Sequence, residues 1–371
     1  MKEETNILHI APAFHSQGGG IFEVVDNLSN AQGDIKNTLV HVLCTSACDI
    51  DSSENRTVHN LLPASFGQLF LLFPLLKWIF NQIRSMTHIH IHGAWSFQFL
   101  FLVPLVFIFN KKITYQPHGL LSPGCMQKSW FVKKIAWFVY QHYYLLFSKN
   151  VICCSDKERQ ELMFLSNNSK KLSIVSNGLH KSFFETKPKS ASRKNKLLFF
   201  SQITPIKNLE NVFHALAMRK ELDGVDHRID IYGYGPSDYI DSLKKLVSQL
   251  DLKENVEFLG PIAREKRVDV YDDYKYFILP SLSENFGIVV LEALSRRCQV
   301  LVSSQTPWRD FEYSDLTVFD PDKDSIYQAL KATMSSDVEI FNPQRDIDWQ
   351  GLNDRFQWDD VVKKINLIYI S

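Results

Sequence analysis

The residues best suited to chemistry are two glutamates in the second half of the chain. Glu284 and Glu292 are separated by seven residues within 280–293, a segment that follows the apolar run 277–279. Glu284 precedes a predicted helix, and Glu292 lies more than one turn inside it. The N–H groups around 286–288 would then have no partner in the helix and could bind a diphosphate. The outer carboxylate could touch a sugar and the deeper one could accept ribose hydroxyls; a solvated acid and a surface salt bridge are the simpler alternatives.

Three loops that follow predicted strands carry further candidates. Lys207, at a helix start, could hold a phosphate, and His118 could position a sugar hydroxyl or a phosphate. Gly18, Gly19 and Gly20 follow the first strand and would let the backbone approach an anion closely. Their order is not GxGxxG, so a dinucleotide fingerprint is poorly supported. The alternatives are a solvated lysine, a hydrogen-bonded loop histidine and a flexible loop.

A row of histidines raises the question of a metal. His88, His90 and His92 alternate, so they would point to one face of a strand. That spacing could suit a metal ion, but no carboxylate accompanies it. We therefore expect no metal, and a polar cleft edge at His92 and Gly93 instead.

Length and composition limit the class of protein. The chain has 371 residues with 41 basic and 41 acidic side chains. This length predicts two domains or one large one, and the formal net charge of zero argues against a nucleic-acid partner. The charge is uneven, because residues 1–185 hold 16 basic and 12 acidic side chains. The N-terminus shows no signal-peptide pattern and the six cysteines form no CxxC pair, so we expect free thiols in a reducing cytosol.

The elements that must position these residues alternate along the chain. Short apolar runs followed by helical segments predict βαβ units and a parallel sheet covered on both faces. Predicted strands are 7–11, 39–44, 89–91, 113–115, 151–153, 172–175, 197–201, 229–232, 256–258, 277–279 and 300–303. Predicted helices are 20–31, 66–84, 96–109, 128–147, 156–165, 208–220, 237–250, 264–273, 287–296, 323–335 and 357–369. A polar stretch, 185–196, predicts a linker between two doubly wound domains, whose ligands would lie at strand ends and in the cleft between domains.

The segment around the two glutamates resembles a known family. "PSLSENFGIVVLEAL" is similar to the EX7E signature of glycosyltransferase family 4, which contains retaining enzymes with a GT-B fold. "IHGAW", "PHGLL", "SNGL", "GYGP", "FLG" and "TPWRDF" follow the order of a branch that builds bacterial surface polysaccharides. The resemblance implies two Rossmann-like α/β domains facing a cleft. They would be an acceptor-binding domain over 1–185, a nucleotide-sugar-binding domain over 186–355, and a helix over 356–371 that packs back on the first domain.

The resemblance also implies an activity and a set of site residues. It implies transfer of a sugar from a nucleotide donor to an acceptor hydroxyl, with retained configuration and with no metal or other cofactor. Glu292 would hold the donor ribose, Glu284 would sit by the sugar ring, Lys207 would neutralise the leaving diphosphate and His118 would contact the donor sugar. The other donor-binding positions that it implies are Gly18, Gly19, Gly20, Gln202, Gly233, Ile262, Asn285, Phe286, Gly287 and Ile288.

Two positions depart from the family pattern. Gln202 stands where the family usually has an arginine, and a neutral amide cannot replace a guanidinium on a diphosphate. Either another cation compensates or donor binding is weakened. Arg296 and Arg297 stand where small residues are common, and we expect a surface location for them rather than compensation for Gln202.

The acceptor side of the chain is basic and rich in aromatic residues. From 128 to 149, aromatic side chains stand among lysines, which suits either an interfacial helix on an anionic membrane or a core helix with a basic outer face. The resemblance implies an acceptor that is a polyprenyl-diphosphate-linked glycan. We therefore expect a peripheral protein on the cytoplasmic face of the membrane. Neither 61–80 nor 88–109 is expected to span it.

Several functions remain open at this point. The leading one is a retaining glycosyltransferase of O-antigen, capsule or exopolysaccharide assembly. Gln202 motivates a second, a catalytically weak or inactive homologue that serves as a partner subunit. A third is a GT-B sugar-nucleotide epimerase, which would need no acceptor. A nicotinamide dehydrogenase is disfavoured because its fingerprint is missing.

Overall fold

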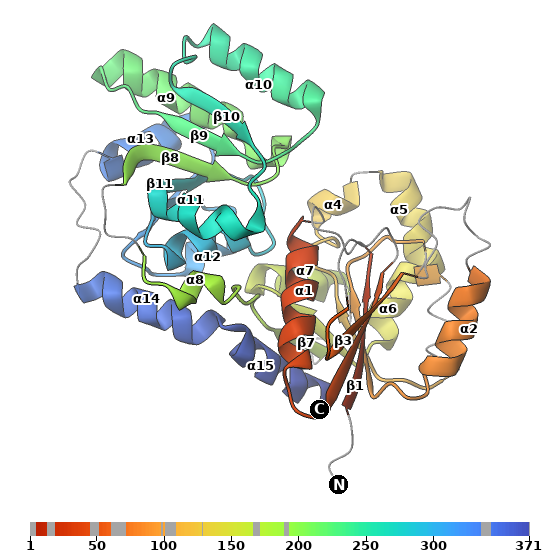
Figure 1. Ribbon diagram of the computed structural model, residues 1–371. Coiled ribbons are helices and arrows are strands. Elements are labelled where there is room, and N and C mark those ends of the chain that lie inside the picture. The colour runs from red at the N-terminus through yellow and green to blue at the C-terminus, as the bar shows by residue number, and fades with distance from the viewer. Residues whose placement is uncertain are drawn as a thin grey trace. The chain divides into compact units, whose positions relative to one another are not determined.

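The chain divides into two compact units in a computed structural model. The structure describes residues 5–12, 19–44, 52–60, 72–97, 99–100, 109–127, 129–165, 171–188, 193–334 and 343–370. One unit comprises Met1–Gly178 and Trp358–Ser371, and the other comprises Leu179–Gln357 (Figure 1). These limits differ by a few residues from the predicted boundaries after 185 and 355. Among the described helices, none combines the length and apolar character needed to cross a bilayer.

The first unit is built on a seven-stranded parallel sheet in the order β3-β2-β1-β4-β5-β6-β7. Its strands are β1 (Thr5–Ala11), β2 (Thr38–Cys44), β3 (Arg56–Asn60), β4 (His88–His92), β5 (Ile113–Gln116), β6 (Asn150–Cys153) and β7 (Leu172–Ile174). Its helices include α1 (Gly19–Gly33), α2 (Leu72–Gln82), α4 (Pro123–Gln127), α5 (Trp130–Ala136), the π-helix η2 (Trp137–Gln141), α6 (His142–Phe147), α7 (Asp156–Leu165) and α15 (Trp358–Ile370). Alternation in β4 gives the two faces different characters: isoleucines point to one face and histidines to the other.

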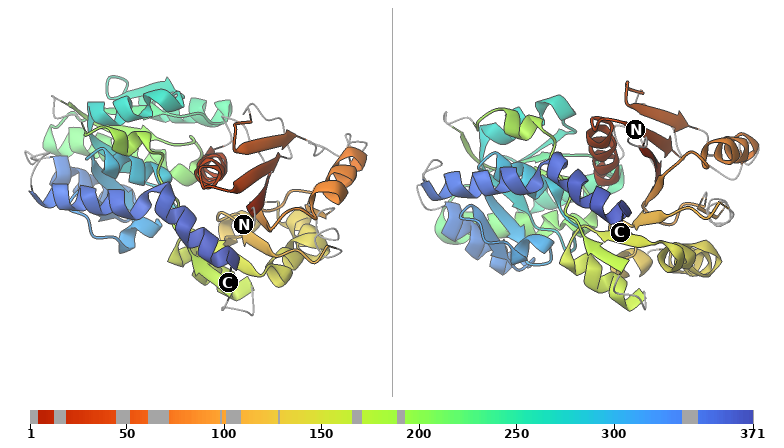
Figure 2. Two further views of the ribbon diagram at one scale, coloured as in Figure 1. Left: turned by 60° about the horizontal axis from the view of Figure 1, so that its bottom comes forward. Right: turned by 90° about the horizontal axis from the view of Figure 1, so that it is seen from below.

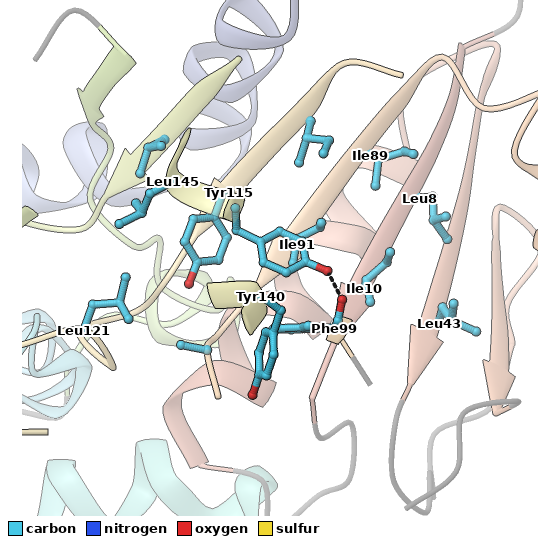
Figure 3. Packing of buried hydrophobic residues seen from close by; sticks show 14 of the residues in the cluster. Leu8, Ile10, Leu43, Ile89, Ile91, Phe99, Tyr115, Leu121, Tyr140 and Leu145 are labelled. Carbon is cyan, nitrogen blue, oxygen red and sulfur yellow. Dashed lines mark hydrogen bonds between the residues drawn. The ribbon is translucent and has the colours of Figure 1, made fainter. Parts of the chain in front are cut away.

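The isoleucine face of this sheet carries the larger apolar core. Ile89 and Ile91 of β4 pack there with Leu8 and Ile10 of β1 (Figure 3), and buried residues of α2, η2, α6 and α7 belong to the same cluster. Tyr144 on α6 is also buried there, and its hydroxyl donates to the carbonyl of Phe99, at 2.6 Å. The phenol therefore enters the core with its polar atom satisfied.

The histidine face is covered by helices from both ends of the chain. Helix α15 packs beside α1, and Leu28 of α1 shares a cluster with Val361 and Ile365 (Figure 2). Trp358, at the start of α15, lies so close to Gly178 that a Cβ there would be 2.7 Å from the indole. The predicted return of the C-terminal helix onto the first domain is confirmed.

The second unit repeats the design with six parallel strands in the order β10-β9-β8-β11-β12-β13. They are β8 (Lys194–Phe200), β9 (Ile229–Tyr232), β10 (Val256–Gly260), β11 (Tyr274–Leu279), β12 (Gln299–Ser303) and β13 (Leu316–Phe319). The helices include α8 (Ser182–Glu185), η4 (Pro205–Lys207), α9 (Leu209–Asp223), α10 (Ser237–Gln249), η5 (Arg264–Lys266), α11 (Arg267–Asp273), α12 (Ile288–Ser295), η6 (Pro307–Asp310), α13 (Lys323–Met334) and α14 (Pro343–Phe356). Helices α9, α10 and α13 lie on one face, and α11 and α12 on the other (Figure 1).

Two sequence predictions about charged residues are wrong. The stretch 185–196 is not a plain linker, because β8 begins at Lys194 and Arg193 is buried with its guanidinium on the carbonyl of Arg296, at 2.8 Å. Arg296 and Arg297 are not surface residues either. Nε and Nη2 of Arg296 donate to the two carboxylate oxygens of Asp272, at 2.9 and 2.7 Å, which offsets the cost of burying the charge. Because its charge is paired with Asp272, Arg296 does not replace the arginine that the family usually has at position 202.

Candidate functional site

The candidate residues of the second unit lie on loops at the carboxyl ends of neighbouring strands. Lys207 follows β8, Gly233 follows β9, and Glu284 follows β11. These strands are adjacent in the sheet, in the order β9-β8-β11, so their loops share one edge. This edge is where ligands bind in open parallel sheets.

Two glycines let the first two loops run against each other. A Cβ on Gly233 would lie 1.9 Å from the carbonyl oxygen of Ser201, and one on Gly235 would lie 1.9 Å from that of Ile203. Any larger residue at either position would push the loops apart. Gln202, between them in the other loop, is exposed, and its amide donates to the hydroxyl of Tyr234, at 3.0 Å.

Lys207 and Glu284 form an ion pair across the loops after β8 and β11. Both side chains are 13% exposed, so the pair is shielded from bulk water yet reachable. The hydroxyl of Ser281 donates to the same carboxylate, at 2.9 Å, and the N–H of Leu282 donates to the carbonyl of Ile206, at 2.8 Å. The ammonium therefore has a fixed position, as a cation that stabilises developing charge requires.

The start of α12 turns backbone N–H groups away from the core. Trp308 is fully buried, and its indole N–H donates to the carbonyls of Phe286 and Gly287, at 2.5 and 3.2 Å. Because a trans peptide points its N–H opposite to its C=O, the N–H groups of Gly287 and Ile288 point away from Trp308. Gly287 has φ +74°, a conformation that favours glycine. The helix start can thus receive an anion.

Glu292, on the same helix, is buried, whereas the alternative of a surface salt bridge required an exposed side chain. Its side chain is only 4% exposed, so a surface salt bridge is wrong. One carboxylate oxygen accepts from the phenol of Tyr271, at 2.8 Å, and the other lies 3.5 Å from the guanidinium of Arg267. Burial, with Glu292 beside it, raises the pKa of Tyr271 well above its ordinary value, so the phenol remains a donor. Arg267 escaped the sequence predictions because nothing in the chain around it marks a site.

In the first unit, His118 follows β5 in a left-handed conformation, with φ +55°. The next residue, Gly119, donates its N–H to the carboxylate of Glu158, at 2.5 Å, and Cys154 donates to the other oxygen, at 2.7 Å. Burial raises the pKa of Glu158 to about 7. Glu158 was not predicted from the sequence, although Ser155-x-x-Glu158 has the pattern of a helix capping box and the Ser155 hydroxyl does accept a hydrogen bond from the Glu158 N–H, at 3.2 Å.

The histidine row is hydrogen-bonded. Ring nitrogens of His9, His90 and His92 lie within 4.8 Å of one another and are all buried. However, His9 uses one nitrogen on His92, at 2.9 Å, and the other on Gln32, at 2.7 Å. The rings of His90 and His92 stack with centroids 4.1 Å apart, which aligns their in-plane lone pairs instead of converging them on an ion. The arrangement suits a hydrogen-bonded stack better than a metal centre.

The structure places the other predicted residues as follows. Gly18 lies outside the described residues. Gly19 has φ +69° at the start of α1, and a Cβ on Gly20 would meet no atom within 4 Å. Ile262 and Asn285 are half-buried, on the loops after β10 and before α12. The structure therefore gathers those predicted residues that it describes at the carboxyl edge of their own unit's sheet.

Two Rossmann-like units of this kind define an α/β protein of the GT-B class. Residues 18–183 match the family described as Glycosyltransferase Family 4, and residues 181–337 match Glycosyl transferases group 1. The chain belongs to this glycosyltransferase family, as the EX7E segment predicted.

Individual relatives are more distant. The O-antigen chain mannosyltransferase RfbU of Salmonella typhimurium is 27% identical over 161 residues, which are 43% of this chain and 43% of that protein. The chain thus spans less than half of that relative's length. The GDP-mannose:cellobiosyl-diphosphopolyprenol alpha-mannosyltransferase of Xanthomonas oryzae is 22% identical over 313 residues, 81% of this chain and 79% of that one. The structure of Alr3699/HepE from Anabaena, solved with UDP and glucose, covers 98% of this chain and 99% of its own, with TM-score 0.76 and 17% identity.

Proposed function

We propose that the protein is a retaining, metal-independent glycosyltransferase. It transfers a sugar from a nucleotide donor to a lipid-linked glycan in the assembly of a bacterial surface polysaccharide. The observation that carries this proposal is the fixed ammonium of Lys207 in the same loop cluster as the outward N–H groups of Gly287 and Ile288. A cation and a helix start together suit a diphosphate.

The proposed reaction breaks the bond between the anomeric carbon and the diphosphate oxygen. A bond to the acceptor oxygen forms on the same face, and the acceptor's proton passes to the departing diphosphate. Lys207 and the N–H groups of α12 stabilise the negative charge on the leaving group. Glu284 holds Lys207 and lies by the sugar ring, Glu292 binds the ribose, and His118 contacts a hydroxyl of the donor sugar.

A donor screen tests this function. Thermal unfolding of the purified chain with UDP-, GDP- and dTDP-sugars should show a rise in melting temperature with one nucleotide class, because a ligand that binds the folded state stabilises it. Sugar transfer should then require an added acceptor. Conversion of the donor without an acceptor would instead indicate an epimerase, and no shift with any donor would indicate a non-catalytic homologue.

We expect Glu292→Ala to weaken nucleotide binding about 10- to 100-fold, the usual effect of losing hydrogen bonds to a charged group. Calorimetric titration with the nucleotide found in the screen measures this Kd. Asp230→Ala is a matched control, because Asp230 is also buried, accepts a hydrogen bond from the phenol of Tyr274, at 2.6 Å, and pairs with Lys196, at 2.9 Å, near the amino ends of the strands, away from the carboxyl edge. An unchanged Kd for the Glu292 variant contradicts the ribose role.

The lipid-linked acceptor is supported by an exposed surface on the first unit, which we call the aromatic-basic face. Trp130, Phe131 and Phe138 on α5 and η2 are 57%, 69% and 66% exposed, and the ammonium of Lys134 lies over the Trp130 ring, at 4.7 Å from its centroid. The core-helix alternative is wrong for these side chains. Exposed aromatic residues beside lysines favour the interface of an anionic membrane, where such an acceptor resides.

The double substitution Phe131→Ser and Phe138→Ser is expected to weaken membrane binding on the order of 100-fold, since each ring loses its burial in the bilayer. Co-sedimentation with phosphatidylcholine vesicles, with and without phosphatidylglycerol, measures the effect. The control is Phe164→Ser on α7, because Phe164 is also highly exposed. Equal binding by all three proteins would rule out the aromatic-basic face as the membrane contact.

A further inference from the structure

A continuous chain of hydrogen bonds links α1 to His118 through the histidine face of the first sheet. Gln32 contacts Nε2 of His9 at 2.7 Å, Nδ1 of His9 contacts Nε2 of His92 at 2.9 Å, and Nδ1 of His92 contacts Nε2 of His118 at 3.0 Å. All four side chains are buried. We call these residues the imidazole chain.

The contacts of Gln32, at the α1 end of the imidazole chain, determine which nitrogen donates in each hydrogen bond. The amide nitrogen of Gln32 donates to Asn366 and Tyr369 of α15, at 3.3 and 3.4 Å, so its carbonyl oxygen faces His9 as an acceptor. His9 must then carry its proton on Nε2, so its Nδ1 accepts a hydrogen bond from the Nε2–H of His92. In the same way, Nδ1 of His92 accepts a hydrogen bond from His118, whose proton is therefore also on Nε2.

The rings hold one proton each at neutral pH, which this direction requires. Burial lowers the pKa of His9 to about 4 and that of His118 to about 3, and it holds that of His92 well below the ordinary value. A neutral imidazole has one donor and one acceptor nitrogen. Because the Nε2–H of His118 donates its hydrogen bond to His92, the unprotonated Nδ1 of His118 is an acceptor.

The surroundings of Nδ1 leave that acceptor available. Among the described residues, the hydrogen-bond contact of this nitrogen is a long one, to the Cys154 sulfur at 4.0 Å, and the thiol lies closer to the amide oxygen of Asn177, to which it donates at 3.5 Å. The ring lies at the carboxyl end of β5, and the adjacent Gly119 is held by Glu158, which fixes the backbone that carries the ring.

We propose that Gln32, His9 and His92 are positioning residues that lock His118 in its Nε2–H tautomer, so that Nδ1 accepts a hydrogen bond from a ligand hydroxyl. That this hydroxyl belongs to the donor sugar rests on the proposed function. The tautomer itself does not. A residue three hydrogen bonds from His118 thus sets the chemical character of its ligand-facing nitrogen.

The test reads tautomers directly in the ligand-free protein. Long-range ¹H–¹⁵N spectra of histidine-labelled protein, assigned with single His→Gln variants, should show Nε2 protonated in His9, His92 and His118. In Gln32→Leu, the ratio of the Nε2–H to the Nδ1–H form at His118 should fall about tenfold, the change that corresponds to one hydrogen bond. A wild-type His118 protonated on Nδ1 would overturn the proposal, and this measurement decides even if the variant does not fold. A folded variant with wild-type tautomers would also overturn it.

The control is His41→Gln, which alters a partly buried histidine that pairs with His59, at 3.2 Å, and is not part of the imidazole chain. It should leave the tautomer of His118 unchanged. The apparent Kd for the donor should rise in Gln32→Leu as the inverse of the remaining Nε2–H fraction, because only that fraction binds. If His118 is protonated on Nε2 but no donor binds, only the proposed function is refuted. If the donor binds while His118 is protonated on Nδ1, only the role of the imidazole chain is refuted.

Discussion

Replacing Lys207 by Met is expected to lower kcat about 10²- to 10³-fold, with a much smaller change in the Kd for the donor. The effect falls on kcat because the charge on the leaving diphosphate grows as the bond breaks, and a fixed cation stabilises that charge most in the transition state. Losses of this size follow removal of one preorganised donor in other enzymes. Single-turnover transfer assays with saturating donor measure the chemical step.

The ion pair complicates a single substitution, because Lys207→Met leaves the Glu284 carboxylate without its partner. A double-mutant cycle with Glu284→Gln separates the two contributions. If Glu284 acts mainly by holding the ammonium, the double variant should be no slower than Lys207→Met. Lys220→Met is the control, because Lys220 pairs with Asp251 at 3.1 Å in an exposed position. Near-normal turnover in Lys207→Met would contradict the leaving-group role.

The parts of the fold that could be predicted are those that local sequence determines. The apolar runs of β1 and β11 and the EX7E segment, which leads into α12, can each be recognised within about fifteen residues. Strand β3 was missed because its sequence is polar and starts with Arg56. That arginine is buried through an ion pair with Asp26 of α1, at 2.7 Å, a partner thirty positions away that no local pattern reveals.

The candidate site shows the same division. The residues of the EX7E motif could be named from their spacing, whereas the burial of Glu292 against Tyr271 depends on how α11 meets α12. Alternation predicted that His90 and His92 share a face. It could not show that His9 joins them, because that follows from the register of β1 on β4, which pairs His9 with His90.

The buried histidines also predict that the first unit is unusually sensitive to acid. Burial lowers the pKa values of His9, His90, His92 and His118 in the folded state, so the unfolded chain binds more protons below its own pKa of about 6.5. Their contribution to the free energy of unfolding is therefore present above pH 6.5 and is lost as the pH falls toward 4. His9 and His118, whose folded-state pKa values are about 4 and 3, each account for about 2 kcal/mol at pH 5, and the pKa values of His90 and His92 shift in the same direction.

Two carboxylates of the first unit work in the opposite direction. Burial raises the pKa of Glu158 to about 7 and also raises that of Glu161, so their contributions are present at low pH and are lost as the pH rises. Between pH 7 and 5 Glu158 returns about 2 kcal/mol, less than the loss from His9 and His118 together, so acid is expected to destabilise the first unit. Urea unfolding at several pH values, with the two units fitted separately, should show a net uptake of protons when the first unit unfolds near pH 5.5. His90→Gln should reduce this uptake, because it removes one of the buried rings. A stability of the first unit that does not change between pH 7 and 5 would mean that these imidazoles are not held neutral, and the imidazole chain would lose the single proton per ring on which its direction depends.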